Sequence, residues 1–195
     1  MVNDLNSKEG TIVLKAIDAA ISAASALKIP KIMFPSFFAG EIKTKKDLEN
    51  TTVFLKRACN LAKSENIVIC TENTISIEDN KKLHRDVNEN NFKLFFDTQN
   101  YALLKKYNPS EMILELRDII VETHIKDGTG DMSNRLLGEG DSGFFNSMKT
   151  FKQINYGGWF IMENYYHKAP LNEKKESYFE QLKIDLSTAK KALAG

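Results

Sequence analysis

The chain has 195 residues, of which 42% are hydrophobic and 27% are charged, and its formal net charge is +1. This composition is typical of a folded globular protein with enough apolar side chains for one sizeable core. A net charge near zero, without a long block of like charge, argues against a nucleic-acid-binding or membrane-binding surface. Two cysteines, Cys59 and Cys70, are too few for a disulfide framework, so we expect both to be reduced core residues.

The start of the chain bears on its compartment. It lacks a basic region followed by an apolar core, so the sequence predicts no signal peptide. The most apolar helical segment, residues 12–29, is interrupted by Lys15, Asp18 and Lys28, and we do not expect it to span a membrane. The sequence therefore predicts a cytoplasmic protein.

The hydrophobic pattern alternates between helices and short strands along the whole chain. Apolar residues at helical spacing predict helices at 11–28, 45–65, 77–90, 101–107, 109–117, 144–154 and 173–193. Short apolar runs bounded by polar residues predict five strands, at 31–34, 67–71, 93–97, 119–124 and 159–163. Strands that alternate with helices indicate a parallel α/β fold, and the absence of a low-complexity linker indicates one domain.

Four successive strands lead to a residue that can bind a metal ion. These residues are Glu72, Asp97, His124 and Glu163. In parallel α/β folds the carboxyl ends of the strands form the edge at which chemistry is placed. Three carboxylates and one imidazole suit Mn²⁺ or Mg²⁺ best, with Zn²⁺ or Co²⁺ as alternatives. The recurrence therefore predicts a divalent metal site, and we expect Mn²⁺.

Each of these residues has a simpler explanation when it is taken alone. A carboxylate at a strand end is often the N-cap of the next helix. A single histidine in an apolar context is more often a core residue than a ligand. The occurrence of all four in consecutive strands, with no strand skipped, favours the metal site.

Several short motifs resemble a known family in combination. They are ENT at Glu72, DTQN at Asp97, HIKD at His124, Arg135 before LGEG, and EN at Glu163. Together they resemble the xylose-isomerase-like TIM barrels of the sugar-phosphate isomerase/epimerase group, with the greatest likeness to L-xylulose-5-phosphate 3-epimerases and ketose 3-epimerases. The likeness extends from about Asn6 to the last helix. It implies a single α/β domain over residues 1–195, a partial (β/α) TIM barrel that is N-terminally truncated and has about five parallel βα units.

The resemblance also implies roles for individual residues. The metal ligands would be Glu72, Asp97, His124 and Glu163, and the two glutamates would also serve as acid and base. Asn100 and Arg135 would approach the substrate, and Glu78 falls where some ketose 3-epimerases carry another substrate-contacting acid. Asn100 could equally be a helix N-cap and Arg135 a solvated loop residue. His84 and His167 receive no role.

The implied reaction is epimerisation of a ketose or ketose phosphate at C3. A proton next to the carbonyl is removed and returned on the other face, through an enediolate. A divalent cation would stabilise the negative oxygen as a Lewis acid. Two carboxylates on opposite faces would exchange the proton, and Arg135 would stabilise the developing oxyanion.

Residues 128–143 form a long loop rich in glycine and aspartate, which makes it a candidate functional loop. Backbone amides of its GEGDSG segment could cradle an anion such as a phosphate. The negative charges of Glu139 and Asp141 argue against a strongly anionic ligand there, so an unphosphorylated ketose remains an alternative substrate.

Other functions are compatible with the same motifs. The chain could be an isomerase or dehydratase of another small hydroxy-carbonyl compound, such as hydroxypyruvate or an inositol derivative, or an inactive truncated paralogue or subunit. The endonuclease branch of the superfamily is disfavoured because its multi-metal site needs more than three histidines. A closed barrel of this type needs eight strands, so the outer strands should be edges that favour self-association or a complementary chain.

Overall fold

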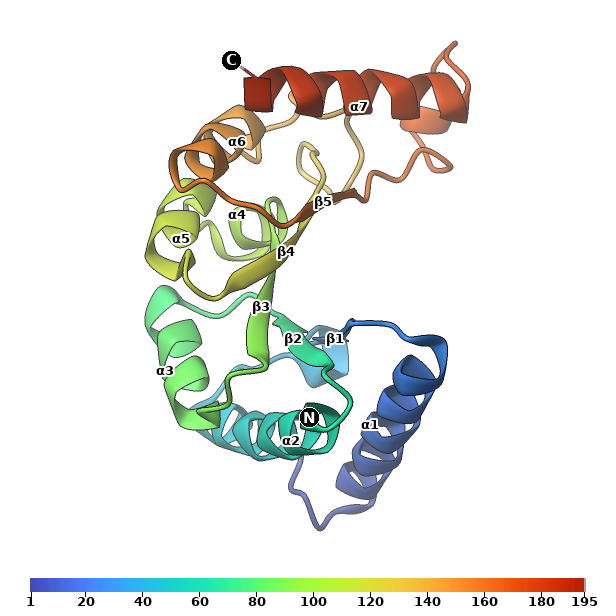
Figure 1. The fold of residues 1–195 in the computed structure, drawn as a ribbon. Helices are drawn as coiled ribbons and strands as arrows, with labels where there is room; N and C mark the ends of the chain where they lie inside the picture. The colour runs from blue at the N-terminus through green and yellow to red at the C-terminus, as the bar shows by residue number, and fades with distance from the viewer. Residues whose placement is uncertain (195) are drawn as a thin grey trace. The chain divides into compact units, whose positions relative to one another are not determined.

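The computed structural model describes residues 1–194 and divides into two compact units, Met1–Phe95 and Phe96–Gly195. Helices and strands alternate along the chain (Figure 1). The strands are ordered β1-β2-β3-β4-β5 in one sheet, so neighbours in sequence are neighbours in the sheet. Successive right-handed βα crossovers give this order. The predicted α/β class with five parallel strands is confirmed, and the single domain stays a prediction.

The first unit contains three α-helices, one 3₁₀ helix and the first strands of the sheet. Its elements are α1 (Lys8–Leu27), β1 (Lys31–Pro35), the 3₁₀ helix η1 (Phe38–Gly40), α2 (Lys45–Lys63), β2 (Val68–Glu72), α3 (Ile77–Val87) and most of β3 (Phe92–Asp97). β1 and β2 pair in parallel with Pro35 opposite Glu72, and β2 and β3 pair in parallel with Thr71 opposite Leu94.

The second unit takes up the chain at the end of β3. Its elements are α4 (Asn100–Lys105), α5 (Pro109–Leu116), β4 (Ile120–Ile125), α6 (Phe144–Gln153), β5 (Trp159–Met162), the 3₁₀ helix η2 (Leu171–Glu173) and α7 (Tyr178–Ala194). β4 and β5 pair in parallel, with His124 opposite Ile161. Every predicted strand and helix is present, with bounds shifted by a few residues.

The largest shifts are at helix starts, where side chains cap the backbone. The Ser7 hydroxyl accepts a hydrogen bond from the Gly10 N–H at 2.9 Å, so α1 begins at Lys8 rather than at residue 11. Ser177 and Glu180 form a reciprocal pair, in which the Ser177 N–H donates to the Glu180 carboxylate at 2.8 Å and the Glu180 N–H donates to the Ser177 hydroxyl at 3.4 Å. This capping box begins α7 at Tyr178 rather than at residue 173.

The core of the first unit forms where α1 and α2 pack on the strands. Ile17 and Ile21 of α1 and Leu55 of α2 are buried in it. Within residues 1–194, α1 is the one helix long and apolar enough to cross a membrane by length and composition, with a mean hydropathy of 1.4. Three buried residues of α1, Ile17, Ile21 and Ala24, belong to this core.

The two cysteines are buried, as predicted, and Cys59 belongs to this core. Cys59 and Cys70 are both buried and not disulfide-bonded. The pKa of the Cys59 thiol is raised to about 12, mainly because the thiol is buried. A thiol that stays protonated is a poor nucleophile, so Cys59 is a packing residue.

An aromatic cluster forms the centre of the second unit. The ring centroid of Phe151 lies 4.8 Å from that of Tyr156, 5.2 Å from that of Phe160 and 6.0 Å from that of Phe96. Because side chains alternate along a strand, the neighbours of Phe160 in β5 point to the other face of the sheet. Those neighbours, Trp159 and Ile161, are 73% and 43% exposed.

The long loop 128–143 wraps around one buried carboxylate. One oxygen of Asp127 accepts hydrogen bonds from the Gly138 and Gly140 N–H groups at 2.9 and 3.1 Å. The other accepts from the Gly128 N–H at 2.9 Å and from the Ser142 N–H and hydroxyl at 3.3 and 2.7 Å. A side chain at Gly140 would collide with this carboxylate and with the Gly128 backbone, so the wrapping requires glycine there.

A second buried carboxylate ties the loop to the last helix. Asp185 of α7 accepts hydrogen bonds from the Leu137 N–H at 2.8 Å, the Asn164 side chain at 2.7 Å and the Tyr166 hydroxyl at 2.6 Å. Asn164 in turn accepts a hydrogen bond from the Asp127 N–H at 2.9 Å. Burial raises the pKa of Asp185, while its three donors act in the opposite direction. The loop is therefore built into the second unit by buried polar contacts.

Replacing the central carboxylate should release this loop. In Asp127→Asn an amide NH₂ must face backbone N–H groups, which leaves buried donors unsatisfied. We expect the free energy of unfolding to fall by about 2 to 4 kcal/mol, measured by urea unfolding. Hydrogen exchange of the Gly138, Gly140 and Ser142 amides should accelerate.

Asp141→Asn is the matched control, because it makes the same chemical change at an exposed residue of the same loop. It should alter stability by less than about 0.5 kcal/mol. Equal stability of the two variants would contradict the structural role given to Asp127.

Candidate functional site

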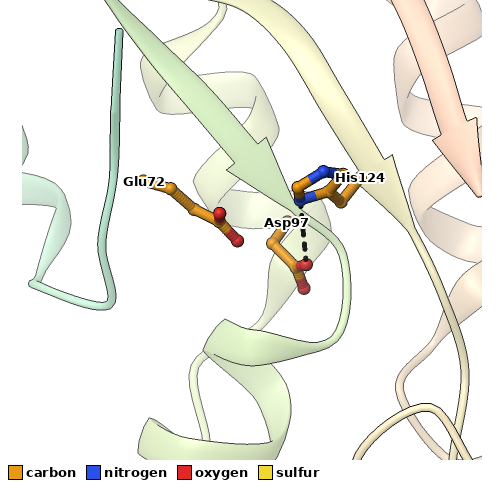
Figure 2. Close-up of side chains that lie close together, drawn as sticks. All are labelled: Glu72, Asp97 and His124. Carbon is orange, nitrogen blue, oxygen red and sulfur yellow. Dashed lines mark ion pairs between the residues drawn. The ribbon is translucent and has the colours of Figure 1, made fainter. Parts of the chain in front are cut away.

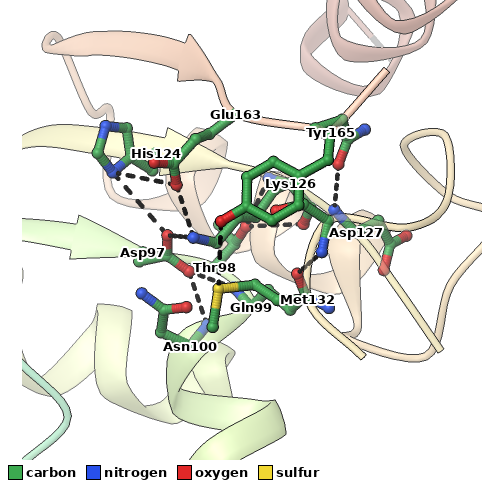
Figure 3. Close-up of polar contacts among 12 residues, drawn as sticks. Asp97, Thr98, Gln99, Asn100, His124, Lys126, Asp127, Met132, Glu163 and Tyr165 are labelled. Carbon is green, nitrogen blue, oxygen red and sulfur yellow. Dashed lines mark hydrogen bonds and ion pairs between the residues drawn. The ribbon is translucent and has the colours of Figure 1, made fainter. Parts of the chain in front are cut away.

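Three of the predicted metal ligands lie together in the second unit. Asp97 is the last residue of β3, His124 lies near the end of β4, and Glu163 directly follows β5. The Glu163 N–H donates to the Ile125 carbonyl at 3.1 Å, which continues the pairing of β4 with β5. The side chains face one another from these strand ends (Figure 3).

Asp97 has two roles, one for each carboxylate oxygen. Its Oδ1 accepts hydrogen bonds from the Gln99 and Asn100 N–H groups at 2.8 and 2.6 Å, at the start of α4. Its Oδ2 faces His124. The helix-start explanation and the site explanation therefore both apply to this residue, whose side chain is 0% exposed.

The donor atoms are spaced as ligands of one ion can be. His124 Nδ1 lies 3.9 Å from Asp97 Oδ2, a contact drawn in Figure 2, and 3.7 Å from Glu163 Oε2. Two ligand atoms that each bind one ion at roughly 2.1 Å can be no more than about 4.2 Å apart. Each of the two carboxylate oxygens lies within this limit of the imidazole nitrogen.

The sequence interpretation missed a fourth member of this cluster, Lys126. Its Nζ lies 2.9 Å from Asp97 Oδ2 and 2.6 Å from Glu163 Oε2, and its side chain is only 3% exposed. Burial alone would lower the pKa of Lys126, but the two carboxylates outweigh this effect and raise it above its ordinary value. A signal was present, because the period of two along a strand puts His124 and Lys126 on one face.

Glu72 and Glu78 belong to the first unit. Glu72 is the last residue of β2 and is 4% exposed. Glu78 lies in the first turn of α3, where its side chain is exposed to solvent. A carboxylate in the first turn also stabilises a helix through the helix dipole, which is an explanation for Glu78 without a ligand.

The two expected substrate contacts in the second unit have local partners. Asn100 is the first residue of α4 and is buried, while the N-cap position is Gln99. The Arg135 N–H donates to the Asp127 carbonyl at 3.2 Å, and its guanidinium donates to the Asn134 carbonyl at 3.0 Å. The guanidinium contact is thus within the loop itself.

The amides of the GEGDSG segment bind an anion that belongs to the chain itself. The anion is the Asp127 carboxylate, which takes the Gly138, Gly140 and Ser142 N–H groups. These donors are therefore used within the fold and are not offered to a phosphate.

Comparison with known proteins identifies relatives of this chain. A model of the family described as xylose isomerase-like TIM barrel matches residues 3–184. A 2-epi-5-epi-valiolone 7-phosphate 2-epimerase from Actinoplanes sp. is 29% identical over 149 residues, which cover 73% of this chain and 54% of that protein. The chain therefore spans about half the length of this curated relative.

Solved structures share the fold at low sequence identity. A D-allulose 3-epimerase from Methylomonas sp. in complex with D-allulose is 18% identical with a TM-score of 0.75, over 98% of this chain and 73% of that chain. The IOLI protein with a bound zinc atom is 13% identical with a TM-score of 0.81, over 100% of this chain and 73% of that chain. These matches confirm the resemblance indicated by the motifs, and the chain belongs to the xylose isomerase-like TIM barrel family.

Proposed function

We propose that the chain is a metal-dependent epimerase or isomerase of a ketose or ketose phosphate. The observation that carries the proposal is the convergence of Asp97 Oδ2, Glu163 Oε2 and His124 Nδ1 at the carboxyl ends of parallel strands. Relatives named as sugar-type epimerases support the reaction class. The activity itself is a proposal, because the chain spans only part of those proteins.

We assign four ligands to one divalent ion: Glu72, Asp97, His124 and Glu163. Figure 2 draws three of them, whose donor types suit a metal ion. Glu72 follows Thr71, which is paired with Leu94, and Asp97 ends the strand that contains Leu94. Both carboxylates therefore belong to the same edge of the sheet. Oxygen-rich donors favour Mn²⁺ or Mg²⁺, and zinc is present in one structural neighbour.

A bound divalent ion would supply Lewis-acid stabilisation of the negative oxygen that develops when a proton leaves the carbon next to a ketone. The carboxylates would move that proton. Glu163 suits this task because its side chain is 39% exposed and can meet a substrate, whereas that of Asp97 is 0% exposed and also holds the start of α4. Glu72 would act on the opposite face of the substrate.

We also propose Asn100, Arg135 and Glu78 as residues that contact the substrate. Arg135 would have to exchange its contact with the Asn134 carbonyl for an oxygen of the substrate. Because Asp127 occupies the loop amides, the structure offers no support for a phosphate at GEGDSG. This observation favours an unphosphorylated ketose at the site. The cytoplasmic location stays a prediction from the sequence.

The proposed proton carriers can be tested by charge-neutral substitutions. Glu163→Gln and Glu72→Gln should each lower epimerisation at least about 100-fold, since general acid–base catalysis contributes on the order of 10²–10⁴. The assay follows deuterium uptake from D₂O into a panel of ketoses and ketose phosphates with added Mn²⁺. Glu176→Gln, at an exposed glutamate, is the control and should leave the rate unchanged.

Either glutamine variant with near wild-type deuterium uptake would contradict the two-carboxylate mechanism. A wild-type chain inactive on the whole panel would instead favour an inactive paralogue or a subunit that needs a partner.

We also propose that the exposed face of β5, which carries Trp159 and Ile161, takes part in association, either with a second copy or with a complementary chain. Trp159 is 73% exposed and Ile161 is 43% exposed, and within residues 1–194 β5 has one neighbouring strand, β4. Apolar side chains beside unpaired strand edges favour pairing with another chain.

Light scattering coupled to size-exclusion chromatography tests this association. The wild-type chain should elute as a dimer or larger species in the micromolar range, and Trp159→Glu should shift it toward the monomer because a charge cannot be buried there. A wild-type chain that is monomeric at all concentrations, alone and with candidate partner fragments, would refute the proposal.

A further inference from the structure

The ammonium group of Lys126 contacts the same two oxygens that would bind a divalent ion. Its Nζ lies 2.9 Å from Asp97 Oδ2 and 2.6 Å from Glu163 Oε2. These are also the oxygens that His124 Nδ1 faces, at 3.9 and 3.7 Å. Figure 3 shows the four side chains turned toward one another. The protein therefore places a cation of its own where the donor set converges.

This arrangement has a physical reason in the charge of the cluster. Buried carboxylates are costly unless a cation or hydrogen-bond donors compensate them. Asp97 is 0% exposed, and the Lys126 side chain is 3% exposed, so water compensates neither group well. One ammonium between two carboxylates lowers the local negative charge and holds their oxygens close together.

We propose that Lys126 is a built-in counter-cation that competes with the divalent ion for Asp97 and Glu163. The inference rests on the metal site of the proposed function. A divalent ion and an ammonium repel each other strongly at a separation of a few ångströms. Binding of the ion should therefore displace the ammonium from at least one of the two oxygens.

Two consequences follow for the site. Lys126 stabilises the metal-free protein, and the same contacts weaken its affinity for the ion. An ammonium displaced from one of these oxygens would be free to donate a hydrogen bond to another acceptor at the site, such as an oxygen of the substrate. Lys126 is in this sense a positioning residue whose partner changes with metal occupancy.

The affinity for Mn²⁺ distinguishes competition from simple support of the ligands. Lys126→Met keeps a side chain of similar length without the charge, and Lys149→Met on the exposed face of α6 makes the same substitution away from the cluster. In calorimetric or electron paramagnetic resonance titrations, we expect Lys126→Met to bind Mn²⁺ at least about tenfold more tightly than wild type. Lys149→Met should match wild type within about twofold.

Thermal denaturation gives a second readout from the same proteins. Without metal, Lys126→Met should melt below Lys149→Met, and saturating Mn²⁺ should raise its melting temperature by more than it raises that of wild type. Unchanged or weaker Mn²⁺ binding by Lys126→Met would overturn the competition.

A measurement on the wild-type chain covers the case in which Lys126→Met does not fold. Acetylation of lysines, followed by mass spectrometry, should leave Lys126 protected without metal and label it faster with Mn²⁺. Equal labelling in both states would overturn the proposal.

The outcomes separate this inference from the proposed function. Mn²⁺ bound by wild type without any of these effects would refute the role of Lys126 alone, whereas no Mn²⁺ binding by wild type or by Lys126→Met would refute the metal site as well. Tighter binding by Lys126→Met in a chain inactive on ketoses would uphold the competition and refute the epimerase.

Discussion

The compensation of buried negative charge at the strand ends is the constraint on which the site depends. Asp97 is fully buried, and each of its oxygens has a defined task, since Oδ1 holds the start of α4 and Oδ2 faces His124 and Lys126. Glu163 approaches the same point from β5. Lys126 supplies a cation at that point, and its ammonium offsets the repulsion between the two carboxylates.

The backbone around this cluster is held by the same kind of interaction. Asp127, the residue after Lys126, gathers the amides of the loop 128–143 around its carboxylate, and Asp185 anchors that loop to α7. Two adjacent residues after β4 thus have different roles. Lys126 belongs to the polar cluster at the strand ends, and Asp127 orders the loop. This coupling explains why a long glycine-rich segment can be well defined without helix or strand of its own.

The helices and strands, and the three strand-end residues of the second unit, could be predicted from the sequence because the patterns that mark them are local. A short apolar run that ends in a polar residue is visible without tertiary information, and Asp97 and His124 follow such runs. Lys126 was missed because a lysine that follows a strand is usually exposed to solvent. Its place in the cluster becomes visible only if the alternation of side chains is continued from His124 by two positions. The wrapping of Asp127 could not be predicted, since most of its donors lie 11 to 15 residues along the chain in a loop without a regular pattern. The capping box at the start of α7 does have a sequence signal, because Ser177 and Glu180 have the S-x-x-E spacing.

Anomalous diffraction from a crystal of this chain soaked in MnCl₂ tests the central claim most directly. The account predicts one strong peak within about 2.0–2.4 Å of Asp97 Oδ2, Glu163 Oε2 and a nitrogen of His124, with a Glu72 oxygen as the fourth protein ligand. Lys126 Nζ should have moved away from at least one of the two carboxylate oxygens. A crystal with Mn²⁺ bound elsewhere, or with the Asp97–Lys126–Glu163 contacts unchanged and no peak beside them, would contradict the assignment of this cluster as a metal site.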